Sequence, residues 1–177
     1  MSCGAAELFN DINTLPQVTV MAIEGAAMAG GFGMACCGDV VIVHPNAKFA
    51  FTETRIGLSP AQISPYVIQR LGARIGRRLM LTGASFTGAE AEALGFADTV
   101  TDDLDTSIAA VKSGVLKCAP GAVAATKALI LTLPKMTREE TAEAAANVFA
   151  DRLTSDEGRE GVMSFAQKRK PNWVDQT

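Results

Sequence analysis

Residues 18–23 form a short apolar run rich in β-branched side chains, and this run passes directly into a segment made mainly of alanine and glycine. The run predicts a buried strand, and residues 24–31 predict a turn. Residues 32–37 are again compatible with a helix, which Gly38 would end. The alternation of strand and helix predicts an α/β fold. Because the first N–H groups of a helix have no partner within it, we expect free backbone donors where the strand passes into the helix.

The remaining elements are predicted from apolar periodicity and turn residues. Extended segments are expected at 40–43, 48–51 and 97–100, helices at 5–14, 66–81 and 87–94, and a loop at 52–65. Thr87 and Glu90 have the spacing of a capping box, and Gly95 is the expected C-cap. Four more helices are expected at 103–117, 121–133, 137–153 and 155–170. The chain thus divides into an α/β layer over 1–118 and a helical region over 119–177, whose apolar faces favour packing on a neighbouring subunit.

Composition and charge exclude several classes of protein. The 177 residues are 48 % hydrophobic and 20 % charged, which argues against disorder. The net charge of -3 argues against a nucleic acid or an anionic membrane as partner. No apolar stretch reaches the roughly 18 residues of a membrane helix, and residues 1–4 lack the pattern of a signal peptide. We therefore expect a cytoplasmic protein.

Cysteine and histidine spacing predicts no metal site. Cys3, Cys36, Cys37 and Cys118 form no C-x-x-C pair, and they are interpreted as small packing residues in a reducing compartment, without a disulfide. His44 follows an apolar run and has no Cys, Asp or Glu nearby at ligand spacing, so we interpret it as a strand-end residue.

The glycines after the first strand permit two interpretations. Gly30, Gly31 and Gly33 either allow a tight turn only, or they let a substrate approach the backbone closely. A dinucleotide fingerprint fails because its third position is Cys36, and neither a phosphate loop nor a Gly-x-Ser-x-Gly elbow is present.

Glu53 is the carboxylate whose position favours chemistry. It closely follows an aromatic-rich strand and precedes an apolar loop, and apolar surroundings would suit it to proton transfer. The alternative is a loop carboxylate paired with Arg55.

Taken together, these segments resemble the enoyl-CoA hydratase/isomerase (crotonase) superfamily. The resemblance rests on PQVTVMAIEGAAMAGGFGMACCGD at 16–39 and AKFAFTETRIGLSP at 47–60. It continues through 70–72, 79–83 and 89–95 to EGVMSFAQKRKPNW at 160–173. Residues 62–66, QISPY, look most like the branch that acts on methylglutaconyl-CoA or isohexenylglutaconyl-CoA.

The resemblance implies a fold and a set of roles. The fold would be a spiral of β-β-α turns with a helical C-terminal region that packs as a trimer or a dimer of trimers. The N–H of Gly30 would be one oxyanion donor to the thioester carbonyl, and Glu53 would activate water or return a proton. Coenzyme A would be part of the substrate, so no separate cofactor and no metal is expected.

The resemblance also suggests residues that contact the substrate. Met28, Gly31, Pro60, Ile63 and Tyr66 are expected to line the acyl site, although the side chains among them also suit a plain core. A further contact is expected from Lys168, near the CoA of an adjoining subunit, and the alternative there is a solvated tail lysine.

Two departures from the family pattern shape the functional hypothesis. The second glutamate of the best-known hydratases is replaced by Gly33, and the strand–turn units that normally precede the opening segment are missing. We expect hydration of an α,β-unsaturated acyl-CoA through an enolate held in an oxyanion hole. The alternatives are an enoyl-CoA isomerase and a truncated, non-catalytic assembly subunit of the same family.

Overall fold

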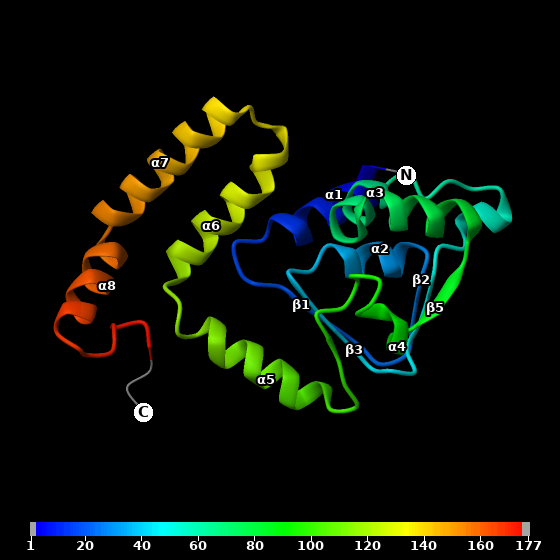
Figure 1. The fold of residues 1–177 in the computed structure, drawn as a ribbon, viewed down its shortest axis with the longest axis horizontal. Helices are drawn as coiled ribbons and strands as arrows, with labels where there is room; N and C mark the ends of the chain where they lie inside the picture. The colour runs from blue at the N-terminus through cyan, green and yellow to red at the C-terminus, as the bar shows by residue number, and fades with distance from the viewer. Residues whose placement is uncertain (1–2, 175–177) are drawn as a thin grey trace. The chain divides into compact units, whose positions relative to one another are not determined.

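The computed structural model describes residues 3–174, which fall into two compact units. The first unit comprises the N-terminal residues through Asn13 together with Thr19–Ala110, and the second comprises Thr14–Val18 together with the chain from Val111. Small sheets and their covering helices form the first unit, and helices form the second (Figure 1). The fold is therefore α/β with a helical C-terminal region, as the sequence predicts.

One sheet of the first unit is entirely parallel. It contains β1 (Val20–Ile23), β3 (Val40–Val43) and β6 (Thr99–Val100), in the order β1-β3-β6. The prediction for 40–43 matches β3 residue for residue. β3 lies in the middle of this sheet, and its Val41, Ile42 and Val43 are fully buried because elements cover both of its faces.

The second sheet positions the candidate site. It contains β2 (Ala26–Met28), β4 (Lys48–Ala50) and β5 (Ser85–Thr87); β2 and β4 are parallel, and β4 and β5 are antiparallel. The expectation of a turn throughout 24–31 is wrong, because β2 lies inside it. Alanine is a poor strand former, and pairing with β4 overrides that preference, since Lys48 N–H bonds to the Gly25 carbonyl at 2.9 Å.

Four α-helices belong mainly or wholly to the first unit. They are α1 (Cys3–Thr14), α2 (Gly30–Cys36), α3 (Ser64–Thr82) and α4 (Gly88–Ala91). The expected loop at 52–65 contains a short 3₁₀ helix, η1 (Glu53–Ile56), and α3 is broken at Gly72, whose φ is 71°. The capping box at Thr87 and Glu90 is confirmed, whereas α4 ends at Ala91, before the expected helix end.

Phenylalanines form the centre of the first unit. The ring of Phe32, on α2, lies 4.4 Å from that of Phe51, 4.8 Å from that of Phe96, and 5.5 Å from those of Phe49 and Phe86. Each of these rings is buried. Because α2 contributes the central ring, this cluster holds the helix that follows the small-residue turn against both β4 and β5.

The second unit consists of helices with little buried surface. It contains α6 (Pro120–Thr132), η2 (Leu133–Lys135), α7 (Arg138–Thr154) and α8 (Asp156–Ala166), while α5 (Leu104–Val115) begins in the first unit and ends in the second. Neither α6 nor α7, both described in full, contains a buried residue. The Glu157 carboxylate accepts the Gly121 N–H at 3.0 Å and thereby links α8 to the start of α6.

Within residues 3–174, no single helix has the length and apolar character needed to cross a membrane. The segments α5 and α6–η2 pass that test of length and composition only when they are counted together, and the chain bends by 102° between them.

Candidate active site

Two segments that carry predicted catalytic residues leave the sheet at the same edge. Met28 at the end of β2 is paired with Ala50 at the end of β4, and Ala29 N–H donates to the Ala50 carbonyl at 3.0 Å. Because the strands are parallel, both carboxyl ends lie at this edge, where ligands of open α/β sheets bind. Gly30 begins α2 just beyond it, and Glu53 begins η1. The register of β2 on β4 therefore brings together the two predicted catalytic positions.

The turn between β2 and α2 leaves backbone donors exposed at the start of the helix. Ala29 has φ 49° and ψ -125°, a conformation that L residues rarely adopt. The Gly33 N–H donates to the Ala29 carbonyl at 3.0 Å. The N–H groups of Gly30 and Gly31 come before this bond in the chain and therefore have no acceptor within the helix. A Cβ built on Gly31 would meet no atom within 4 Å. The backbone at Gly31 is thus open to close approach.

The Glu53 carboxylate has a buried oxygen, Oε2, with no hydrogen-bond partner among residues 3–174. Arg55, the alternative partner, donates instead to the Gly83 carbonyl. A buried oxygen without a partner is unfavourable by about 1–3 kcal/mol, and more when charged, unless a ligand supplies a donor. The carboxylate of Glu53 is thus available to a bound molecule.

The predicted wall residues have different environments. Ile63 is buried against Gly33, and Pro60 is buried as well. Tyr66 is half-buried, with its ring 6.1 Å from that of Phe9 on α1, and burial raises the pKa of its phenol.

Phe9 also connects this wall to the turn. Its Cζ lies 3.9 Å from where a Cβ on Gly30 would stand, so α1 contacts both α3 and the start of α2. Met28, in contrast, is exposed at the end of β2.

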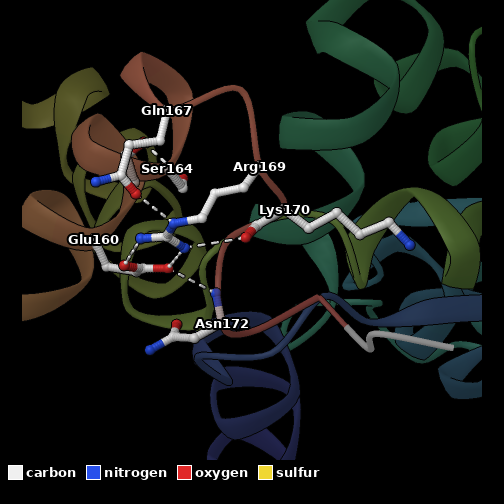
Figure 2. Close-up of polar contacts among 7 residues, drawn as sticks. Glu160, Ser164, Gln167, Arg169, Lys170 and Asn172 are labelled. Atoms are coloured by element: carbon white, nitrogen blue, oxygen red, sulfur yellow. Dashed lines mark hydrogen bonds and ion pairs between the residues drawn. The ribbon is translucent and has the colours of Figure 1, made fainter.

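Lys168 belongs to the second unit, and its CoA contact stays a prediction. It is exposed and has φ 54°, in the turn that follows α8. Figure 2 shows how the next residue anchors this turn: Arg169 donates to both carboxylate oxygens of Glu160, at 2.6 and 2.7 Å. Asn172 N–H donates to the same carboxylate at 2.9 Å.

His44 has a partner that its local sequence does not reveal. It directly follows β3, as predicted, and its Nε2 lies 3.2 Å from Oδ1 of Asp102, while Nδ1 accepts the Asn46 N–H. The pairing was missed because Asp102 is distant in the sequence and reaches His44 only through the β3–β6 pairing. In the part of the chain that the structure describes, no three His, Cys, Asp or Glu side chains could jointly hold a metal ion.

Comparison with known proteins agrees with this architecture. The sequence profile of the family Enoyl-CoA hydratase/isomerase matches residues 1–176. A Thermus thermophilus protein, provisionally named an enoyl-CoA hydratase, is 32 % identical over 174 residues, which cover 97 % of this chain and 69 % of that protein. The carnitinyl-CoA dehydratase of Proteus mirabilis is 30 % identical over 177 residues, covering 96 % of this chain and 66 % of the relative.

A solved structure is similar throughout the chain. AtuE of Pseudomonas aeruginosa has a TM-score of 0.94 at 39 % sequence identity, and the match covers 98 % of this chain and 68 % of that one. The present chain therefore spans about two thirds of the length of these proteins.

Proposed function

The chain belongs to the enoyl-CoA hydratase/isomerase family, and from this we propose that it binds an acyl-CoA thioester and adds water to its α,β double bond. The observation that carries the proposal is the shared edge of β2 and β4. There the start of α2 supplies backbone donors, and Glu53 supplies an unpaired carboxylate oxygen.

In the proposed reaction, Glu53 carries out both proton transfers. Its carboxylate takes a proton from water while the hydroxyl adds to the β-carbon. The double bond shifts to the bond between the α-carbon and the carbonyl carbon, and the π pair of the carbonyl moves onto the thioester oxygen. The Gly30 N–H stabilises that enolate oxygen, and one such donor contributes about 3–4 kcal/mol. The carboxylic acid form of Glu53 then returns its proton to the α-carbon. One water is added, and Glu53 regains its charge.

Isomerisation is the second candidate, and Gly33 favours it. With no carboxylate at that position, Glu53 could instead remove a proton from the α-carbon of a 3-enoyl-CoA and return it at the γ-carbon through the same enolate. No water enters the product. Mass analysis separates the two reactions, because hydration adds 18 Da and isomerisation leaves the mass unchanged.

The acyl group is proposed from the sequence alone. The resemblance of residues 62–66 makes a branched glutaconyl-CoA ester the first to test. Dehydration of carnitinyl-CoA, the reaction in the name of one relative, reverses a hydration and is a suitable second assay.

For the second unit we propose a homotrimer or a dimer of trimers. Support comes from the absence of buried residues in α6 and α7 and from large apolar side chains that are strongly exposed. These include Ile130, Phe149, Val162, Met163 and Phe165. If packing on other subunits through this surface is the chain's only role, the protein is a non-catalytic assembly subunit.

Glu53→Gln tests the catalytic proposal. It keeps the side chain's size and removes the base, so hydration of crotonyl-CoA should fall by about 10²–10⁴-fold. Glu24→Gln, at an exposed carboxylate before β2, is the matched control and should keep its rate. Unchanged turnover in Glu53→Gln contradicts the assignment. Absence of both acyl-CoA binding by calorimetry and turnover by the wild type favours the assembly subunit.

A further inference from the structure

Gly33 and Ile63 meet where α2 packs against α3, and the space between them is completely filled. A Cβ built on Gly33 would lie 2.5 Å from the Ile63 Cβ and 3.2 Å from its Cδ1, and it would be closer still to Cγ2. Ile63 is 3 % exposed. Position 33 therefore has no room even for a methyl group.

Neither backbone is free to move away. The Gly33 N–H donates to the Ala29 carbonyl at 3.0 Å, and the Gly33 carbonyl accepts the Cys37 thiol at 3.4 Å. On the other side, the Ile63 carbonyl accepts the Val67 N–H at 3.0 Å and so opens α3. The Ile63 Cβ is bonded directly to this held backbone, so no change of rotamer relieves the overlap.

With no room for a side chain at position 33, the segments around the shared edge of β2 and β4 carry a single carboxylate. Residues 25–38, which contain β2 and α2, include no Asp or Glu. In residues 45–89, which contain β4 and α3, Glu53 is the only one. The neighbouring α1 adds Asp11, whose charge acts on Tyr66 and helps to raise the pKa of that phenol.

We propose that Ile63 is a specificity-determining residue, because its side chain keeps position 33 closed and so restricts this enzyme to chemistry with one carboxylate. The inference rests on the proposed function and deepens it. Both proton transfers pass through Glu53 because the space for a second carboxylate is taken by a buried apolar side chain. Ile63 acts through position 33 and needs no contact with the reacting atoms.

A double-mutant cycle of melting temperatures tests, without any substrate, whether Ile63 excludes a side chain from position 33. Gly33→Ala should lower the melting temperature by about 5 °C or more, as expected for overpacking of a filled core. Adding Ile63→Gly removes the three atoms nearest to that Cβ, so the double variant should melt within about 1 °C of Ile63→Gly alone. Ile63→Ala keeps the Cβ and is the matched control that should give no such recovery. A Gly33→Ala protein as stable as wild type, or equal behaviour of the two double variants, overturns the proposal.

The pH profile of crotonyl-CoA hydration tests the chemical part. Wild type and Ile63→Gly should each show one ionisation on the acidic limb of log kcat/KM, with a slope of one. Gly33→Glu combined with Ile63→Gly should show a second ionisation, because a second carboxylate joins the proton transfers: it steepens the acidic limb where it acts as a base and adds a basic limb where it acts as an acid. A profile with the same single ionisation as the wild type in an active double variant overturns the proposal. If the wild type turns over no enoyl-CoA, the proposed function fails, and the melting cycle still decides whether Ile63 closes position 33.

Discussion

Ala29 donates its N–H to the carbonyl oxygen of Ala50 at 3.0 Å, one residue beyond the Met28–Ala50 pair of the parallel ladder. This bond extends the β2–β4 pairing to the turn itself. It holds Ala29 at φ 49°, and the chain then enters α2 at Gly30 while β4 continues toward Glu53. The catalytic proposal depends on this strained residue.

Ala29→Gly should stabilise the protein by about 1 kcal/mol, because relief of roughly 1–3 kcal/mol of backbone strain exceeds the entropy that glycine adds to the unfolded chain. Ala29→Val should destabilise it, since a β-branched residue tolerates positive φ poorly. Urea unfolding measures both. Ala26→Gly, in β2, is the control and should cost about 0.5–1 kcal/mol. A loss of stability in Ala29→Gly contradicts the role of strain.

Arg55→Ala should destabilise the first unit by about 1 kcal/mol, because it removes a charged hydrogen bond to the Gly83 carbonyl and loosens η1, which begins with Glu53. Arg77, exposed on α3, provides the control: Arg77→Ala should change the unfolding free energy by less than about 0.5 kcal/mol. Equal effects of the two substitutions would show that the Gly83 contact contributes nothing.

Phe32→Ala should cost about 3–5 kcal/mol, since it empties the centre of the phenylalanine cluster and removes contacts with Phe49, Phe51, Phe86 and Phe96. Chemical denaturation provides the measurement. The control is Leu81→Ala at a side chain that is 66 % exposed, where less than about 0.5 kcal/mol is expected. A loss below 1 kcal/mol for Phe32→Ala would refute the central role of this ring.

Stability should fall as the pH rises above 9. Burial raises the pKa of the Cys36 thiol from 9.0 to about 12, so the folded state keeps a proton that the unfolded state loses. This contribution is fully present below pH 9 and declines between pH 9 and about 12. Cys36→Ala should flatten the fall in unfolding free energy over this range, whereas Cys118→Ala, at an exposed thiol, should not. Identical slopes in all three proteins contradict the prediction.

The turn around Lys168 should loosen in acid. Hydrogen bonds from Arg169, together with the Asn172 N–H, lower the pKa of the Glu160 carboxyl below its ordinary 4.5 (Figure 2). The stabilisation is present above that ordinary value and is lost as the pH falls through the lowered pKa. The fluorescence of Trp173, the single tryptophan, should report the change.

Glu160→Gln should abolish this acid transition in the Trp173 signal. Asp156→Asn is the control, because Asp156 is fully exposed and lies 3.9 Å from Arg159. A transition that persists in Glu160→Gln assigns it to another group.

Much of the secondary structure follows from local patterns. β3 and the helices α5, α6 and α7 match their predicted ranges closely, because apolar periodicity and the proline breaks act within a few residues. The prediction of a helix through residue 170 is wrong at its end, because α8 ends at Ala166 and Lys168 adopts a positive φ in the turn that follows. The two short strands β2 and β5 were missed because only their pairing with β4 makes them strands.

Local sequence patterns suffice to predict the α/β fold with its helical C-terminal region and to single out Glu53 and the glycines after the first strand as candidates. Folding places these candidates at one sheet edge, pairs Arg55 with Gly83 and packs Ile63 into the space at position 33. The two kinds of feature differ because the interactions behind them act over different ranges. Helix periodicity and turns depend on neighbours along the chain, whereas strand register, hydrogen-bond partners and filled space depend on segments that only folding brings together.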